Sequence, residues 1–438
     1  MSELHKASAP WITPPHSEHR LAAGIDELGQ VIKHQGEMTS NKAIKHSNTW
    51  RSATVADVCE MRNGRGFGPD DWDTTGLPII RIQNLNGGQK FDYFSGVPEE
   101  RWLVEPGQML FSWAGTKGVS FGPTIWRGKR GVLNQHIFKV QSKPGIDEEW
   151  LYWALKHVTD RIEAQSHGFK STLVHVKKSD IERQPITIPP LGEQRRIAQI
   201  LSSWDQAIAK AERLVSSGQR QAEDLGNVLL TGQRRFGDYV SWQPKPVSHM
   251  IRESRVIGST GDVAKKITVK LYGRGVVGKA EKRAGSESTQ YYRRSAGQFI
   301  YSKLDFLNGA FGLIPDSLDG YESTLDLPAF DLLPGIYPKW FLHYVSRESF
   351  YTGHLGLANG GRKARRVNPS DLLRITIATP CLEEQMRIAD AIDTAQKATV
   401  IETLHLNLLC QERAALMSQL LTGKCRVKLI ESKTELQP

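Results

Sequence analysis

An internal repeat is the feature that most constrains how this chain can fold. When the sequence is shifted by 191 positions, residues 191–232 align with residues 382–423, and 12 of these 42 positions are identical. The identities gather at the two ends, where residues 191–198 match 382–389 and both copies finish in Leu-Leu-Thr-Gly. A repeat of this length indicates two related structural units in one chain.

Each copy of the repeat has the apolar spacing of a coiled-coil seam, with intervals of three and four residues. The seam consists of Ile197, Leu201, Trp204, Ile208, Leu225 and Leu229 in the first copy and Ile388, Ile392, Leu406, Leu409, Leu416 and Leu420 in the second. A proline before each copy and a Thr-Gly at its end are helix start and stop signals. We therefore expect two helices of about 40 residues, each roughly 60 Å long at 1.5 Å per residue. Two ordinary core helices of one globule are the alternative.

Length and charge limit the class of protein. A chain of 438 residues exceeds one hydrophobic core, so we expect roughly two to four domains. The 57 Lys and Arg against 47 Asp and Glu are compatible with a polyanionic partner. Four cysteines without CxxC spacing favour a reducing, cytoplasmic location. No apolar run approaches the length of a membrane span and no signal-peptide core is present, so we expect neither a membrane nor a secreted protein.

The repeat divides the chain into segments. We expect a loosely ordered N-terminal extension (1–47), a first domain (48–190), a first spacer helix (191–235), a second domain (236–380), a second spacer helix (381–427) and a C-terminal tail (428–438). Short β-type runs separated by turn clusters predict strands at 78–82, 109–111, 135–140, 267–272, 298–301 and 323–331, and apolar periodicity predicts helices at 147–164 and 337–350. The fold class is therefore α+β (mixed α/β), with two globular domains joined by two long helices.

The order of the segments constrains their geometry. The first helix must carry the chain into the second domain, and the second helix buries its seam best by returning antiparallel along the first. Two similar domains would then be held at a fixed spacing with approximate twofold symmetry, as in DNA-binding dimers that read two half-sites. Because the two domains have diverged, the two half-sites could differ, which predicts an asymmetric bipartite target.

Basic turns and amide side chains in both domains suit DNA contact. Arg and Lys neutralise phosphates, whereas Arg, Asn and Gln can also bond base edges. The candidate DNA-binding residues are Arg62, Arg65, Arg81, Gln83, Asn84, Lys117, Arg127, Asn134, Gln135 and His136 in the first domain, and Arg274, Lys279, Arg293, Arg294, Arg362, Lys363, Arg365 and Arg366 in the second. For each of them, a solvated basic surface without a ligand is the alternative.

Motifs for catalysis are incomplete in this sequence. Residues 273–279 (GRGVVGK) resemble a phosphate-binding loop, but Ala280 stands where Mg²⁺ binding needs a Ser or Thr hydroxyl. A turn after a strand that presents Arg274 and Lys279 fits better. Residues 368–371 (NPSD) lack the second proline and the aromatic residue of an adenine methyltransferase loop, so we interpret them as the cap of a helical turn. No His/Cys spacing predicts a metal site.

Residues from Trp50 to about Val427 resemble a specificity (S) subunit of a type I restriction–modification system. The matching stretches include NGRGFGPDDWD at 63–73, GLPIIRIQNLNG at 76–87, VLNQHIFKV at 132–140 and, above all, PPLGEQRRIA at 189–198. The second helix start, PCLEEQMRIA at 380–389, has Cys381 in place of the second proline.

The resemblance implies a non-catalytic subunit with two target-recognition domains, each reading one half of an asymmetric, interrupted DNA sequence. The two helices would set the spacing and dock partner subunits. Two modification subunits would bind S-adenosylmethionine and methylate adenine, and restriction subunits would bind ATP and Mg²⁺, so we expect no cofactor in this chain. A protein-interaction scaffold with a coiled-coil rod is the alternative function. An enzyme fused to its own recognition domain is disfavoured by the incomplete catalytic motifs.

Overall fold

The computed structural model describes residues 50–165, 173–280, 285–353 and 366–428, so the expected N-terminal extension lies outside the described residues. Within these ranges the chain forms two compact units. The first unit comprises residues 50–210 and 406–428, and the second comprises residues 211–405. Each long helix therefore contributes one half to each unit. In the described ranges, no helix is both long enough and apolar enough to cross a membrane.

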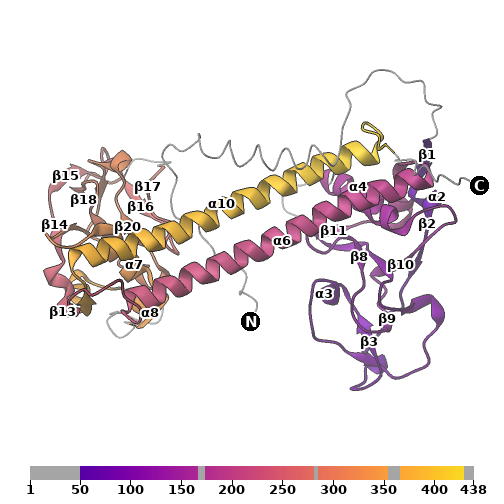
Figure 1. The fold of residues 1–438 in the computed structure, drawn as a ribbon, viewed down its shortest axis with the longest axis horizontal. Coiled ribbons are helices and arrows are strands. Elements are labelled where there is room, and N and C mark those ends of the chain that lie inside the picture. The colour runs from indigo at the N-terminus through magenta and orange to yellow at the C-terminus, as the bar shows by residue number, and fades with distance from the viewer. Residues whose placement is uncertain (1–49, 166–172, 281–284, 354–365, 429–438) are drawn as a thin grey trace, which may run out of the picture. The chain divides into compact units, whose positions relative to one another are not determined.

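The first unit combines short strands with two substantial helices (Figure 1). Its strands are β1 (Arg51–Thr54), β2 (Cys59–Asn63), β3 (Leu77–Ile80), β4 (Tyr93–Phe94), β5 (Leu103–Val104), β6 (Met109–Ser112), β7 (Ala114–Thr116), β8 (Gly122–Ile125), β9 (Gly131–Leu133), β10 (Ile137–Ser142), β11 (Leu173–His175) and β12 (Pro185–Ile188). Its helices are α2 (Val55–Val58), η1 (Pro69–Asp71), α3 (Ile82–Leu85), η2 (Glu100–Trp102), α4 (Glu148–Gln165), α5 (Lys178–Glu182) and the first half of α6 (Leu191–Leu230).

Two four-stranded sheets and a covering helix organise the first unit. One sheet has the order β2-β10-β6-β8 and the other β4-β3-β9-β5. Trp150, Leu151 and Val158 form the fully buried stripe of α4, and they share a core with Phe111 and Phe138 of the first sheet. Because α6 adds side chains to the same core, α4 ties that sheet to the long helix.

The second unit follows the same plan. Its strands are β13 (Gln243–Pro246), β14 (Ile251–Ser254), β15 (Ile257–Thr260), β16 (Ile267–Val269), β17 (Val276–Gly278), β18 (Gln290–Arg293), β19 (Phe299–Tyr301), β20 (Phe311–Leu313), β21 (Glu322–Ser323), β22 (Ala329–Leu332) and β23 (Thr376–Thr379). Its helices are η3 (Val247–His249), η4 (Phe306–Asn308), η5 (Asp316–Leu318), α7 (Pro338–Ser346), α8 (Glu348–Gly353), α9 (Pro369–Arg374) and the first part of α10 (Leu382–Leu421).

Sheet topology shows that the repeat extends beyond the helices. The order β14-β22-β19-β20 repeats the order β2-β10-β6-β8 strand for strand, and the antiparallel pair β13–β23 repeats β1–β12. The units differ in the remaining strands: β4-β3-β9-β5 and the pair β11–β7 in the first, against β15-β18-β21 and the separate hairpin β16–β17 in the second. The shared strands thus form a common frame, and the additional strands form the parts that have diverged.

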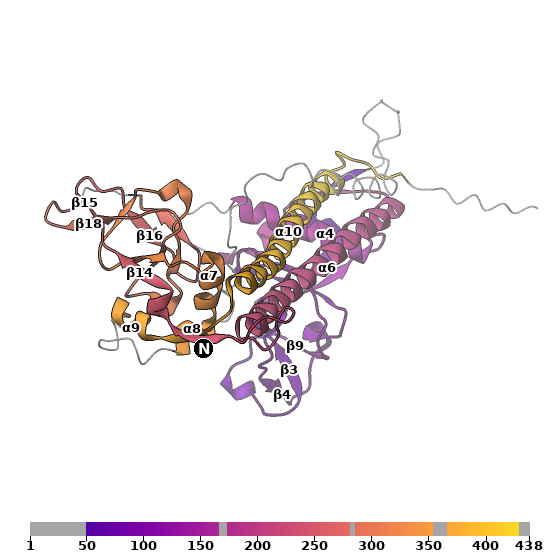
Figure 2. The ribbon, with the colours of Figure 1, turned by 60° about the vertical axis from the view of Figure 1, so that its left-hand side comes forward.

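Both long helices predicted from the repeat are present, each with 40 residues. In the second unit Leu229, near the end of α6, shares a core with Ile392, near the start of α10. In the first unit Ile197, near the start of α6, shares a core with Leu420, near the end of α10. The two helices therefore run antiparallel (Figures 1 and 2), which confirms the predicted fold class.

Three predicted elements are wrong in detail. The expected strand at 323–331 is split into β21 and β22 because the turn between them supplies oxygen atoms to a buried arginine, as described below. The expected helix at 337–350 is split into α7 and α8, since Arg347 adopts an extended conformation with ψ 130°. The strand predicted at 267–272 ends at Val269, where the turn of the β16–β17 hairpin begins.

Candidate DNA interface and its supporting contacts

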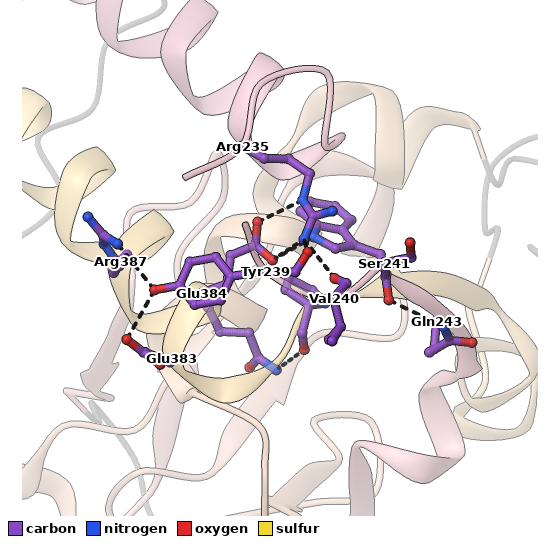
Figure 3. Close-up of polar contacts among 11 residues, drawn as sticks. Arg235, Tyr239, Val240, Ser241, Gln243, Glu383, Glu384 and Arg387 are labelled. Carbon is purple, nitrogen blue, oxygen red and sulfur yellow. Dashed lines mark hydrogen bonds and ion pairs between the residues drawn. The ribbon is translucent and has the colours of Figure 1, made fainter. Parts of the chain in front are cut away.

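A buried carboxylate fastens the start of α10 to the chain that follows α6 (Figure 3). Glu384 is fully buried and accepts hydrogen bonds from Arg235 Nε at 2.9 Å, Arg235 Nη2 at 2.8 Å and Trp242 Nε1 at 2.9 Å. The Arg235 guanidinium also lies 5.8 Å from the centre of the Trp242 ring. This Trp–Glu–Arg group, which we call the latch, joins three segments of the second unit.

The first unit contains the same latch. Glu193, at the start of α6, accepts hydrogen bonds from Arg426 Nε at 2.9 Å, Arg426 Nη2 at 2.6 Å and Trp50 Nε1 at 3.1 Å. Arg426 follows the end of α10 just as Arg235 follows the end of α6. The latch was not predicted from the sequence, although the repeated glutamate and the Trp and Arg pairs at offsets near 191 are visible signals of it.

The glutamine that follows each latch glutamate positions the covering helix. Gln194 accepts a hydrogen bond from the backbone N–H of Asp147, just before α4, and Gln385 accepts one from the backbone N–H of Tyr337, just before α7, both at 2.8 Å. Each glutamine also donates to the carbonyl of the preceding proline segment. The identical Glu-Gln pair of the repeat therefore orients each unit on the long helices.

In the first unit, the loops after β2 and β9 lie together. Arg65 donates its backbone N–H to Leu133 at 2.8 Å and forms a β-bridge with Asn134. Its guanidinium pairs with Asp71 at 2.6 Å and lies 5.1 Å from the centre of the Phe67 ring. Arg65 therefore both shapes the loop and contributes charge to it, since its side chain is 38 % exposed.

Two further predicted residues extend this loop surface. Gln135 Nε2 lies 3.3 Å from His136 Nε2, and Gln135 is exposed. Trp113, which the sequence reasoning did not select, packs against both His136 and His175 with ring centroids 5.2 and 4.7 Å away. Its indole N–H donates to the Gln135 carbonyl at 3.2 Å. The result is a half-exposed aromatic and imidazole cluster beside the candidate base-reading amide.

Asn84 was predicted to read a base, and the structure contradicts that role. Its side chain is buried, accepts a hydrogen bond from the Arg81 backbone N–H and donates to the carbonyls of Gly88 and Lys90. Its amide group thereby closes the 81–90 loop. Arg81 itself pairs with Asp92, while Gln83 between them is exposed.

The remaining first-unit candidates lie apart from the loop surface or carry a partner. Arg62 is exposed on β2 and pairs with Glu60 at 2.8 Å. Lys117 donates to the carbonyl of Glu163 on α4. Exposed Arg127 acts electrostatically on Tyr152 of α4, whose pKa is raised by burial and by Asp205 and lowered by Arg127. Lys117 is therefore bound to α4 rather than to the loops after β2 and β9.

In the second unit, Arg274 and Lys279 lie on the β16–β17 hairpin, and both are exposed. This confirms the interpretation of residues 273–279 as a turn beside a strand, since β17 and not a helix follows. Arg293 is exposed at the end of β18. Arg366 is exposed and pairs with Asp326 at 3.2 Å. Arg362, Lys363 and Arg365 lie outside the described residues.

Arg294 is the second candidate that the structure contradicts. It is completely buried and donates to Ser323 Oγ at 2.8 Å, to the Ser254 carbonyl at 2.7 Å and to the Leu327 carbonyl at 3.4 Å. Burial lowers the pKa of its guanidinium to about 10. Arg294 is thus an internal cross-link of the second unit that DNA does not reach.

All of the predicted seam residues are buried or half-buried. Ile197, Leu201, Ile208, Leu229, Ile388, Ile392 and Leu420 are buried, and Trp204, Leu225, Leu406, Leu409 and Leu416 are half-buried. The outward faces carry other apolar residues: Leu214, Ile401 and Leu404 are at least half exposed in the second unit. The helices therefore bury one apolar seam and leave further apolar side chains exposed to solvent.

The loops after β2 and β9 in the first unit and the β16–β17 hairpin in the second unit both have side chains suited to binding DNA. Exposed guanidinium and ammonium groups can neutralise phosphates, and exposed amides can bond base edges. Among the residues that the structure describes, no group of three His, Cys, Asp or Glu side chains is arranged to hold a metal ion.

Residues 47–215 match the family model described as the type I restriction modification DNA specificity domain. The chain is 22 % identical over 381 residues to the type I restriction enzyme MjaVIII specificity subunit of Methanocaldococcus jannaschii, covering 80 % of this chain and 86 % of that one. It is 25 % identical over 205 residues to the EcoBI specificity subunit of Escherichia coli, covering 45 % of this chain and 42 % of the relative.

A solved structure from work on the structural basis of complex assembly and conformational transition of the type I R-M system shares the fold. It aligns with 87 % of this chain and with that entire chain, with a TM-score of 0.58 and 16 % identity. The matched domain and these relatives show that the chain is similar to the specificity subunits of type I restriction–modification systems.

Proposed function

We propose that this chain is a specificity subunit that reads an asymmetric, interrupted DNA sequence, with one half-site for each unit. The observation that carries this proposal is the duplicated frame. Two units share the same four-stranded sheet order and the same latch but differ in the strands and loops attached to that frame. A common frame with divergent loops is the arrangement expected when two unlike half-sites are read by related domains.

In this proposal, basic side chains hold phosphates and a few polar side chains read base edges in double-stranded DNA. In the first unit, Gln135 and the loops around Arg65 make these DNA contacts. In the second unit, the exposed cations around Arg274 make them. Asn84 and Arg294 are excluded from this role, since both are buried with internal partners.

The helix pair sets the gap between the half-sites. Forty residues at about 1.5 Å each give roughly 60 Å of helix. Removing seven residues from each helix preserves the seam but shortens each helix by about 10 Å, and the gap should shrink by about three base pairs at 3.4 Å each. The half-sites themselves should stay unchanged.

Partner subunits supply the chemistry. We propose that two modification subunits, which bind S-adenosylmethionine, dock on the helices, where Leu214, Ile401 and Leu404 are exposed. Restriction subunits, which bind ATP and Mg²⁺, join the same complex. The chain itself then acts without a cofactor and without catalysis.

Selection from a pool of random-sequence duplexes tests the recognition role. At moderate salt the full-length chain with a modification subunit should enrich two unlike sequence blocks at a fixed separation, because contacts that depend on charge alone weaken steeply with salt. Enrichment of no sequence would favour the protein-interaction scaffold instead.

A further inference from the structure

The β16–β17 hairpin of the second unit has no counterpart in the sheet orders of the first unit. Its strands pair antiparallel, with Ile267 opposite Gly278 and Val269 opposite Val276. Ile267, Val269 and Val276 face the core. Lys270, Arg274 and Lys279 are exposed, and residues 263–280 contain no acidic residue. Among the described residues, none of these three cations has an ion-pair partner, so the hairpin exposes three positive charges beside the ring of Tyr272.

The turn of this hairpin holds Tyr272 in an unfavourable backbone conformation. Its φ is 55°, a left-handed value that L-residues with bulky side chains rarely adopt. Two hydrogen bonds fix the turn in place: Tyr272 N–H donates to the Asn308 carbonyl and Gly273 N–H to the Gly309 carbonyl, both at 2.8 Å. The tip is therefore rigidly supported from the loop at 308–309.

Packing does not explain a tyrosine at this position. The residue is 63 % exposed, so its ring gains little from burial within the chain. A glycine would adopt the same backbone without strain. Strained, exposed positions of this kind are found at functional sites, where the side chain is needed for contact with a ligand.

We propose that the β16–β17 hairpin enters a groove of duplex DNA, with Tyr272 against the base pairs and Lys270, Arg274 and Lys279 on the neighbouring phosphates. This inference rests on the DNA-reading function proposed above. A two-stranded β-ribbon fits the major groove, and an exposed aromatic ring at its tip meets the base edges there. The three positive charges match the negative charge of the backbone.

Two substitutions at position 272 separate a ligand contact from a structural role. Tyr272→Gly relieves the backbone strain, so it should raise the midpoint of thermal unfolding by about 2–4 °C. Tyr272→Asn, which also tolerates this conformation, should leave the midpoint unchanged. Both should weaken binding by about tenfold, the loss expected for one contact to a base pair. The probe is a labelled duplex carrying the sequence that the full-length wild-type chain, with its modification subunit, enriches most from a random pool.

Salt dependence distinguishes the tyrosine from the cations. Tyr272→Gly should leave the slope of binding constant against salt concentration unchanged, because no charge is lost. Lys279→Gln should reduce that slope by about 1, the value expected for one phosphate contact. Lys245→Gln, which removes an exposed lysine on β13 of the same unit, is the matched control and should change neither affinity nor slope.

Each outcome decides the inference. Weaker binding by a Tyr272→Gly variant that is at least as stable as wild type supports it. Equal binding by both position-272 variants, while the wild type retains its enriched sequence, overturns the inference and leaves the proposed function standing. A wild-type chain that enriches no sequence removes the proposed function and this inference together.

Discussion

Replacing Glu384 by Gln should destabilise the second unit, because it removes the charge at the centre of the latch. Hydrogen bonds to a charged group contribute about 1.5–3 kcal/mol each, and breaking a buried ion pair costs about 3–5 kcal/mol. Arg235 keeps 28 % of its side chain exposed, so water recovers part of this loss. We therefore expect Glu384→Gln to lower the free energy of unfolding by about 2–4 kcal/mol.

The two latches provide an internal comparison. In the first unit, Glu193 is 7 % exposed and its partner Arg426 is 41 % exposed, against 0 % and 28 % for Glu384 and Arg235. Because the first latch is better hydrated, Glu193→Gln should have the smaller effect. Urea unfolding of the full-length chain, followed by far-ultraviolet circular dichroism, measures both variants.

The neighbouring Glu383 is the matched control. It is exposed and accepts one hydrogen bond from Tyr239 Oη at 3.1 Å, so Glu383→Gln should change stability by no more than about 0.5 kcal/mol (Figure 3). If Glu384→Gln costs no more than Glu383→Gln, the latch does not hold the start of α10, and the account of the repeated Glu-Gln pair is wrong.

Three further predictions concern stability. Burial would raise the pKa of Asp393, but hydrogen bonds from His343 and Lys339 lower it from 3.8 to about 2. The carboxylate therefore stabilises the fold above about pH 4 and loses this effect as the pH falls towards 2. After allowance for the 47 % exposure of Lys339, the contribution is about 1–2 kcal/mol, and Asp393→Asn should abolish it in unfolding measured across that range. Gly423→Ala should cost about 1–2 kcal/mol, since φ is 72° and the new Cβ would lie 3.0 Å from the Trp50 ring; a midpoint of thermal unfolding equal to wild type would contradict this. Arg294→Met should lower stability by about 3 kcal/mol in urea, because Ser323 Oγ and the Ser254 carbonyl lose a charged donor in the interior, and an unchanged urea midpoint would refute the internal role assigned to this arginine.

The sequence predicted the long helices well because their signal is both periodic and duplicated. The apolar seam and the Glu-Gln starts could be identified from spacing alone. The hydrogen bonds of the two latch glutamates could not be identified in this way, because each latch joins residues far apart in the chain. Arg235 and Glu384 are 149 positions apart, and Arg426 and Glu193 are 233 apart. Pairing over such distances is set by how the units close and not by local propensity.

The predicted strand at 323–331 was wrong because a distant side chain bonds to the middle of this apolar segment. Residues 323–331 are rich enough in apolar residues to predict one strand, but Arg294 draws the Leu327 carbonyl and Ser323 Oγ towards its guanidinium, and the chain turns there. Nothing in the local pattern signals that an arginine 29 positions away is completely buried.

The candidate site was predictable by residue type but not by exposure. Amide and guanidinium groups that read bases also satisfy buried carbonyls, and the sequence does not distinguish these two uses. Asn84 and Arg294 are buried and form hydrogen bonds within the chain, whereas Gln135 and Arg274 remain exposed. Tyr272 was overlooked because its signal is a backbone conformation, which composition does not reveal.

Mapping N6-methyladenine across the genome of cells that carry this chain with an active modification subunit tests the central claim most directly. The account predicts one interrupted motif with two unlike halves, a fixed gap and a methylated adenine in each half. A single uninterrupted motif, or no methylated motif when the modification subunit is active, would contradict the claim that the two units read two half-sites.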